Sequence, residues 1–293
     1  MSFLERVKQL PALGVGVSTE YGAGQSEGAL DPLQLHRDHP QMAAFLELGI
    51  ETAKGLDESA AAWVDSGLPT TYHFLDINLD EPEDMDEAWL NEVRALIERV
   101  KPAWLCGDAG LWHIGRRERG HMLLLPPILT DDSASALADG IIALREATGL
   151  EVLPENPPGA AFVGDLHLLD FFGRLAERAD TGILLDCAHL AIYQKSMGYE
   201  ALDGMDGFPL DRVVEAHVAG STQRESNGFT WLEDDHTTDV LKETWAILDR
   251  LASGGSNLRA VVFECERNRS QDVLAGFQSI LQRVAGTPAG KAS

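Results

Sequence analysis

The chain has 293 residues, of which 44% are hydrophobic and 24% charged, and its formal net charge is -24. This composition excludes a disordered chain, because it supplies enough apolar side chains for a large buried core. The charge argues against nucleic acid as a partner, since binding to phosphate backbones depends on Lys and Arg. Two interpretations of the charge stay open: an acidic surface that keeps the protein soluble, and a field that attracts cations.

Cysteine usage and hydropathy predict a cytoplasmic protein. Cys106, Cys187 and Cys265 are odd in number and widely spaced, so they do not indicate a disulfide framework. Each is interpreted as a small buried residue at the end of an apolar run. No stretch reaches the ~20 apolar residues of a membrane span, and the first residues lack the apolar segment of a signal peptide. We therefore expect no membrane partner.

Short apolar runs alternate with longer amphipathic stretches, which is typical of repeated βα units on a parallel sheet. Eight runs have the length of strands, and they cover residues 13–17, 45–50, 70–77, 103–106, 150–153, 182–185, 213–218 and 259–263. Eight βα units need roughly 250 residues, so one barrel would account for nearly the whole chain. The sequence predicts an α/β protein with one (β/α)8 TIM barrel over residues 1–285 or, failing that, an open doubly wound sheet.

Apolar residues recur at helical spacing between these runs. Leu90, Val93, Ile97 and Val100 fall on one face of the segment 86–100. Further helices are expected near residues 133–148, 166–178, 240–251 and 271–284. Residues 286–293 are small and polar with Gly and Pro, which predicts a flexible C-terminal tail. A Walker-type loop and a glycine fingerprint are absent from the sequence, so no nucleotide cofactor is indicated.

Acidic and imidazole side chains gather where the predicted strands end. In a barrel the loops after the eight strands converge on one face, and catalytic groups cluster there. Taken singly, His73 fits a hydrogen-bonded core residue, and Glu155 fits a helix cap or a partner of an arginine. Asp186 is harder to explain in this way, because a buried charge is costly unless a cation or partner compensates it. The residues at strand ends, or in the loops that follow them, are Glu20, His73, Glu155, Asp186, His189, Glu215, His217, Asp234, Asp235, His236, Glu264 and Glu266.

As a set, these residues predict a metalloenzyme. So many acids in one barrel mouth would repel one another, and a bound cation would relieve the repulsion. Carboxylate and imidazole ligands without a thiolate cluster suit iron, manganese or, less well, zinc. They do not suit a structural zinc site of the thiolate type.

Five segments carry a family resemblance, namely 153–157 (LPENP), 182–189 (GILLDCAH), 217–220 (HVAG), 234–236 (DDH) and 263–264 (FE). In their order and spacing, over about residues 11–284, the chain resembles the multinuclear non-haem iron-dependent oxidative enzymes, a family that includes the iron subunit of methanobactin biosynthesis. The resemblance implies a barrel with two or three irons that uses dioxygen to oxidise a residue, Cys foremost, of a ribosomally made precursor peptide. It also implies a separate small partner protein that recruits the peptide.

The resemblance also assigns roles by position. It makes His73 the imidazole ligand of the third strand, Glu155 a carboxylate ligand of the fifth and Asp186 that of the sixth. His189 falls where the family often has Asn. The implied metal ligands are His73, Glu155, Asp186, His189, His217, Asp234, His236 and Glu264.

One stretch departs from the family pattern. Many members carry a His shortly after the fourth strand, but here residues 106–113 read CGDAGLWH. Either Asp108 or His113 substitutes for that imidazole, or one iron position is weakened. Asp108 and His113 are therefore candidate catalytic residues, and Glu20, just past the first predicted strand, is the third.

Two other functions stay open. A barrel like those of sugar isomerases and epimerases would use the same side chains around manganese or magnesium, without oxygen. A metal-binding barrel that has lost catalysis would serve as an assembly subunit, an idea supported by the missing fourth-strand His alone. Iron content and oxygen consumption distinguish the oxidative enzyme from the isomerase.

Overall fold

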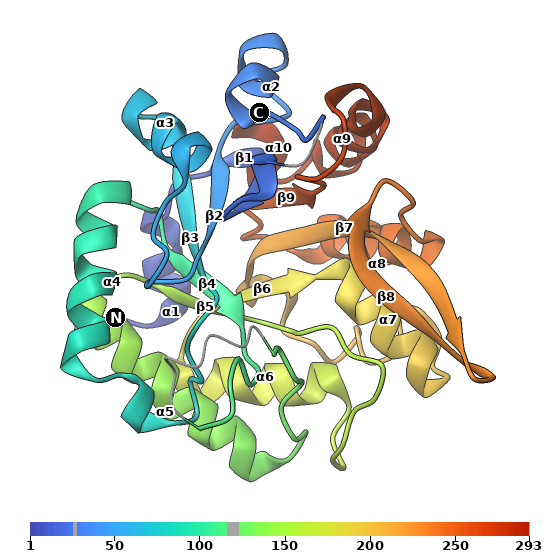
Figure 1. Cartoon of the computed structure of the whole chain (residues 1–293). Helices are drawn as coiled ribbons and strands as arrows, with labels where there is room; N and C mark the ends of the chain where they lie inside the picture. The colour runs from blue at the N-terminus through green and yellow to red at the C-terminus, as the bar shows by residue number, and fades with distance from the viewer. Residues whose placement is uncertain (26–27, 116–122, 293) are drawn as a thin grey trace.

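The computed structural model describes residues 1–25, 28–115 and 123–292 and shows a closed parallel barrel (Figure 1). The sheet order is β6-β5-β4-β3-β2-β1-β9-β7-β8, and an additional pairing of β6 with β7 closes the ring. The predicted TIM barrel is confirmed, and each of the eight predicted runs contains or overlaps one barrel strand. The barrel strands are β1 (Gly14–Glu20), β2 (Leu46–Ile50), β3 (Thr70–Phe74), β4 (Leu105–Asp108), β5 (Val152–Glu155), β6 (Ile183–Asp186), β7 (Val213–Ser226) and β9 (Ala260–Glu264).

Helices follow the strands and cover the outside of the barrel. Their ends are set locally: Asp57, Asp86 and Thr130 cap helix N-termini by accepting a backbone N–H. The helices are α1 (Phe3–Arg6), α2 (Pro32–Asp38), α3 (Glu58–Ser66), α4 (Glu87–Val100), α5 (Asp131–Thr148), α6 (Leu168–Ala179), α7 (Cys187–Met197), α8 (Lys242–Gly254), α9 (Ser270–Val284) and α10 (Pro288–Ala292). Short 3-10 turns lie at Val7–Gln9, Ala23–Gln25, Pro82–Asp84 and Leu210–Arg212. No helix in the described part of the chain is long and apolar enough to cross a membrane.

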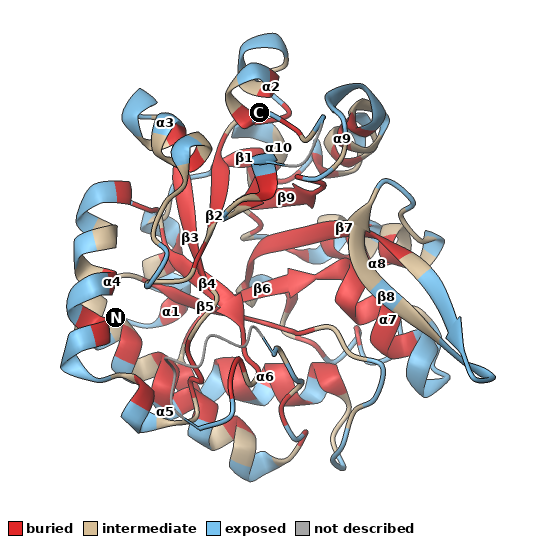
Figure 2. Ribbon diagram, in the orientation of Figure 1, coloured by how far each residue is buried: buried red, intermediate tan, exposed pale blue. Residues whose placement is uncertain are grey.

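Apolar side chains fill both sides of the sheet. One cluster packs the outer face of the strands against the helices, and a second fills the inside of the barrel. The inner cluster includes Phe45, Trp104 and Val262, and Phe3 of α1 belongs to it with 0% exposure. Within the barrel the strands are therefore buried, while the outward faces of the helices, β8 and the end of β7 are exposed or half-buried (Figure 2). This leaves the carboxyl-end face of the barrel as the place for polar side chains.

A β-hairpin extends β7 beyond the barrel, and sequence analysis missed it. β8 (Phe229–Thr237) pairs antiparallel with the second half of β7. β8 contains residues 234–236, which sequence analysis placed in a loop after the seventh predicted strand. Asn227 and Gly228 form the turn with φ of 51° and 77°. An Asn-Gly pair between two extended segments is a strong hairpin signal, and it stands in the sequence.

The C-terminal residues differ from expectation. Residues 286–293 were expected to be a tail without secondary structure, but Pro288–Ala292 form α10. Ala289 is fully buried, and its backbone N–H donates to the carbonyl oxygen of Leu258 at 3.0 Å. Pro288 begins the helix, because a fixed φ and a missing N–H are tolerated in the first turn. The small side chains that suggested a tail are the ones that allow this close packing.

We expect Gly140→Ala to destabilise the fold. Gly140 lies inside α5, where a Cβ would come 2.7 Å from the backbone carbonyl carbon of Leu79 and closer still to its oxygen. Overpacking against backbone typically costs about 1–3 kcal/mol, which exceeds the roughly 1 kcal/mol that Ala gains over Gly in a helix. Urea denaturation should show a lower free energy of unfolding for Gly140→Ala than for the wild-type protein. Gly207→Ala is the control, since nothing lies within 4 Å of its Cβ position; equal stability of the two variants would contradict the packing argument.

Candidate metal centre

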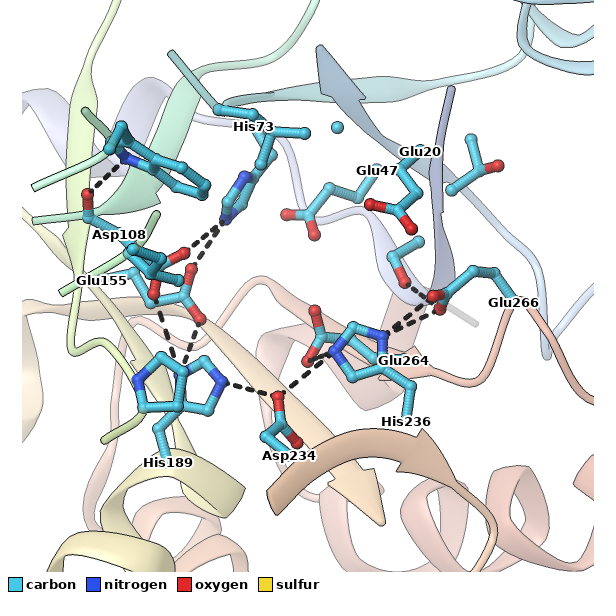
Figure 3. Close-up of a pocket in the computed structure, with 17 residues that line it drawn as sticks. Glu20, Glu47, His73, Asp108, Glu155, His189, Asp234, His236, Glu264 and Glu266 are labelled. Carbon is cyan, nitrogen blue, oxygen red and sulfur yellow. Dashed lines mark hydrogen bonds and ion pairs between the residues drawn. The ribbon is translucent and has the colours of Figure 1, made fainter. Parts of the chain in front are cut away.

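A cavity of about 270 Å³ opens at the carboxyl ends of the barrel strands (Figure 3). Acidic and imidazole side chains dominate its polar lining, and no Lys or Arg is among the lining residues that the structure describes. Its carboxylates are Glu20, Glu47, Asp108, Glu155, Asp234, Glu264 and Glu266, and its imidazoles are His73, His189 and His236. Such a cavity holds a strongly negative field, because low-dielectric walls focus it.

The first part of the site comes from three neighbouring strands. His73 of β3, Asp108 at the end of β4 and Glu155 at the end of β5 are all buried. Nε2 of His73 lies 2.8 Å from Oε2 of Glu155 and 3.8 Å from Oδ2 of Asp108. The register of β4 and β5 brings two of these side chains together, since Asp108 pairs directly with Glu155 in the sheet.

The end of β6 contributes Asp186 and His189. Asp186 caps α7 by accepting the backbone N–H of His189 at 2.6 Å, and this cap fixes the first turn of the helix. Nε2 of His189 then lies 3.0 Å from Oδ2 of Asp234. Asn156 holds the backbone of Asp186 from both sides, because its side chain donates to the carbonyl at 3.0 Å and accepts from the N–H at 2.9 Å.

His217 of β7 lies under the cavity with 0% exposure and contacts carboxylates on both sides of its ring. Its Nε2 is 3.1 Å from Oε2 of Glu47. Its Nδ1 faces Oε1 of Glu155 at 3.2 Å and Oε1 of Glu264 at 3.3 Å. The ring therefore connects carboxylates from three different strands.

The hairpin strand β8 closes the other side of the cavity. His236 places Nδ1 at 2.9 Å from Oε1 of Glu266 and Nε2 at 3.3 Å from Oδ2 of Asp234. The hydroxyl of Ser18 donates to Glu266 at 3.3 Å, which anchors that carboxylate to β1. His236 has a φ of 52°, a left-handed conformation that non-glycine residues rarely adopt.

The crowded charges shift the pKa values of the site. Burial alone would lower the pKa of His73, but its hydrogen bond to Glu155 and the nearby carboxylates outweigh burial and raise the pKa to about 9. Burial, together with the charge of Glu155, raises the pKa of Asp108 to about 7. Burial would raise the pKa of Glu155, but the charges of His217 and His73 outweigh it and lower the pKa. Without a cation, protons on the imidazoles therefore balance the carboxylates.

Several buried ligand-type atoms in this site have no hydrogen-bond partner among the described residues. They are Oδ1 of Asp108, Oδ2 of Asp186, Nδ1 of His217, Oδ1 of Asp234 and Oε2 of Glu264. Three groups of side chains bring one ligand atom each within 4.8 Å of one another: His73, Asp108 and Glu155; Glu155, Asp186 and His217; and Glu47, His217 and Glu264. Unpaired buried acceptors are costly, and divalent cations satisfy them. The donor set thus fits more than one metal ion, with Glu155 and His217 shared between groups.

The structure gathers most of the candidate residues at one place, but Glu20 and His113 contact partners outside that group. Glu20 lies at the rim of the cavity and forms an ion pair with Arg267. His113 is not brought to the cavity, because its Nε2 contacts Asp84 at 2.7 Å and its Nδ1 contacts the carbonyl oxygen of Gly115 at 2.7 Å. Of the two residues considered in place of the fourth-strand imidazole, only Asp108 lines the cavity.

Glu47 lines the cavity but is not among the candidate residues from the sequence, and Glu266 lines it although the family resemblance did not imply it as a ligand. Glu47 lies in the middle of an apolar run, so it was counted as part of a strand and not as a strand end. Leu46 and Leu48 belong to the outer core, which turns the residue between them toward the barrel axis. A single carboxylate on the inward face of a barrel strand was the signal that could have identified it.

Together, the closed barrel and the buried carboxylate and imidazole groups define a TIM-barrel protein whose strand-end site can hold metal ions. Comparison of the sequence with models of protein families is consistent with a metal-binding TIM barrel. Residues 28–280 match the model of the family described as RiPP precursor modification enzyme MbnB/TglH/ChrH, where RiPP denotes a ribosomally synthesised and post-translationally modified peptide. The chain belongs to this family.

Individual curated relatives have low sequence identity to this chain. A UPF0276 protein of Rhizobium meliloti (strain 1021) is 27% identical over 218 residues, which cover 72% of this chain and 70% of the relative. A UPF0276 protein of Rhizorhabdus wittichii is 26% identical over 182 residues, which cover 62% of this chain and 63% of the relative. The matches thus span between about three fifths and three quarters of the chain.

Solved structures share the fold at low sequence identity. A xylose isomerase-like TIM barrel protein from Mycobacterium smegmatis in complex with magnesium has a TM-score of 0.55 and 11% identity, and covers 95% of this chain and 99% of that one. A xylose isomerase domain containing protein from Salmonella typhimurium also has a TM-score of 0.55 and 11% identity, with 94% and 96% coverage. At this identity the likeness concerns the fold alone.

We expect the metal-free protein to lose stability as the pH rises from 6 to 9. The folded-state pKa of His73 is raised from 6.5 to about 9 and that of Asp108 from 3.8 to about 7, so the folded state holds protons that the unfolded chain releases. For each group the stabilisation is fully present below the unfolded-state pKa and is lost progressively up to the folded-state pKa, so Asp108 contributes to the loss only up to about pH 7 and His73 from 6.5 to about 9. Thermal denaturation with a chelator measures this effect. A melting temperature that stayed constant or rose toward pH 9 would contradict it.

Proposed function

We propose that this chain is a multinuclear non-haem iron enzyme that uses dioxygen to modify a residue, with Cys favoured, of a ribosomally synthesised precursor peptide. Family membership supplies the precursor peptide as the class of substrate. The observation that carries the metal is the set of buried carboxylate and imidazole atoms with no hydrogen-bond partner among the described residues. Carboxylate and imidazole donors suit ferrous iron.

The proposed ligands form overlapping groups, which supports two or three irons. His73, Asp108 and Glu155 would hold one ion, and Asp186 and His217 a second that shares Glu155. His217 also has Glu264 within reach, and Asp234 lies between His189 and His236, each of which has a nitrogen within 3.3 Å of Oδ2 of Asp234. Bound iron would supply the oxidising chemistry, with positions left for a substrate thiolate and dioxygen.

The chain's own residues provide orientation and shielding. Glu47 accepts from Nε2 of His217, which leaves Nδ1 as the nitrogen available to a metal. Leu75, Trp112 and Pro158 form an apolar part of the cavity wall, which limits water around the reacting groups. Asp108, whose pKa is near 7 in the metal-free site, would give up its proton when it binds a metal.

The cavity volume fits a side chain better than a folded substrate. At about 270 Å³ it lies just below the usual range for small-molecule sites, roughly 300–1,000 Å³. An extended peptide could therefore place one residue in the cavity while the rest of it stays outside. We propose that a separate small partner protein holds the remainder, and the net charge of -24 favours a basic peptide segment or partner surface.

We expect two or three irons per chain after purification without oxygen, measured by elemental analysis. His217→Ala and Asp186→Ala should lose iron, because His217 is a buried donor shared by two of the groups and Asp186 is a buried donor of one of them. His39→Ala is the matched control, since this half-buried imidazole follows α2 outside the cavity lining. Circular dichroism establishes that the variants are folded. Unchanged iron and turnover in both site variants would refute the proposal, and manganese or magnesium without iron would favour the isomerase-like function.

We expect oxygen consumption to depend on a cysteine in the peptide. The peptide to test is a short Cys-containing precursor, if the neighbouring genes encode one, supplied with its partner protein. An oxygen electrode should record uptake by the iron-loaded enzyme with this peptide and a loss of at least tenfold with the Cys→Ser peptide. Equal uptake with both peptides would exclude Cys as the modified residue, and mass spectrometry of the product would then locate the true one.

A further inference from the structure

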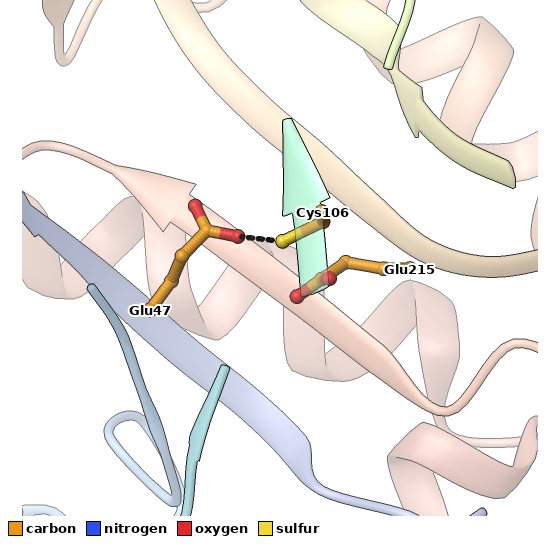
Figure 4. A group of neighbouring side chains, drawn as sticks. All are labelled: Glu47, Cys106 and Glu215. Carbon is orange, nitrogen blue, oxygen red and sulfur yellow. Dashed lines mark hydrogen bonds between the residues drawn. The ribbon is translucent and has the colours of Figure 1, made fainter. Parts of the chain in front are cut away.

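Three ionisable side chains meet inside the barrel, one layer below the cavity (Figure 4). They are Glu47 of β2, Cys106 of β4 and Glu215 of β7, and each offers one ligand atom within 4.8 Å of the others. Their exposed fractions are 2%, 0% and 0%. Cys106 and Glu215 do not line the cavity, so this cluster extends deeper than the candidate metal centre.

The cluster is out of place in a barrel core. The inner layer around it is apolar, with Leu153, Leu184 and Val262 among its members. Two carboxylates and a thiol in such surroundings are costly to bury without a compensating charge. Among the described residues, the ion pairs of Glu47 include no Lys or Arg, and its partner is His217.

Hydrogen bonds satisfy the cluster only in part. Cys106 Sγ lies 3.3 Å from Oε2 of Glu47, and the indole N–H of Trp104 donates to Oε2 of Glu215 at 2.6 Å. Oε1 of Glu215 is buried without a hydrogen-bond partner in the described structure. Figure 4 shows this carboxylate beside the thiol of Cys106. A fully buried acceptor that lacks a donor and lies against two further anionic ligand types indicates a place for a cation.

We propose that Glu47, Cys106 and Glu215 form a second kind of metal site in this protein, one that takes a thiophilic divalent transition metal. A thiolate selects zinc or ferrous iron over magnesium and calcium, and the two carboxylates add the remaining negative charge. Binding replaces the thiol proton of Cys106 with the metal and releases that proton to solvent. Glu47 lines the cavity, so it stands on the route by which a cation would enter.

The position of Glu47 links this site to the candidate metal centre. Its Oε2 contacts both the thiol of Cys106 and, at 3.1 Å, Nε2 of His217. A metal held by Cys106 and Glu215 would therefore fix the orientation of the Glu47 carboxylate, and through it the ring of His217. The site itself requires neither oxygen nor a peptide, so its test is independent of the proposed function.

Cobalt is the probe, because Co²⁺ replaces zinc and iron and absorbs in the near ultraviolet only when a thiolate binds it. Titration of the metal-free wild-type protein with Co²⁺ should give this charge-transfer band, and Cys106→Ala should lose it while the visible bands from nitrogen and oxygen ligands remain. Glu215→Gln should weaken cobalt binding in the charge-transfer band by at least tenfold. The controls are Cys187→Ala and Cys265→Ala, whose thiols are also buried but lie outside this cluster.

The double variant Cys187→Ala/Cys265→Ala keeps Cys106 as the only thiol and should retain the full band. Titration of the double variant tests whether Cys106 binds the metal even if Cys106→Ala does not fold. A wild-type titration without a thiolate band would overturn the proposal, as would a band that disappears in the double variant. Iron content and oxygen uptake are read separately, so loss of the cobalt band would leave the oxidative function standing.

Discussion

His217 is fully buried, with Nε2 on Glu47 and Nδ1 facing Glu155 and Glu264. Carboxylates that converge on one imidazole in a low-dielectric interior repel one another strongly, and they stay ionised only if positive charge lies among them. The barrel supplies that charge as protons on imidazoles or as bound cations. The packing of the lower barrel, the caps and the hairpin serve to hold this arrangement in place.

Rigid elements position the ligand atoms, which metal binding requires. His73, Asp108, Glu155, His217 and Glu264 lie on barrel strands that are buried on both faces. The remaining side chains are positioned by local hydrogen bonds, such as the helix cap of Asp186, which orients His189. The β7–β8 hairpin brings Asp234 and His236 back over the barrel from a segment that leaves the sheet. Preorganisation of this kind lowers the cost of binding a metal.

Features of the fold and the site could be predicted from the sequence where a local residue pattern indicated them. The barrel could be predicted because eight short apolar runs alternate with helical periodicity, and Asp186 could be singled out because it follows an uninterrupted apolar strand. Glu47 could not, since a lone acid inside an apolar run resembles a tolerated exception until the strand's inward face is known. His113 was included because it is near β4 in the chain, but its contacts are with Asp84 and Gly115. The hairpin was missed although Asn227 and Gly228 signalled it.

Side chains alternate along each barrel strand, and this links the two layers of polar residues. Glu47, Cys106 and Glu215 each stand two residues before Gly49, Asp108 and His217, so one inward-facing row lies directly above the other. Moving a strand by one residue would turn both rows outward and bring apolar side chains to the axis. A one-residue insertion or deletion inside one of these strands would therefore misplace both rows at once. The loops above the barrel can change in length without moving the side chains that the strands hold.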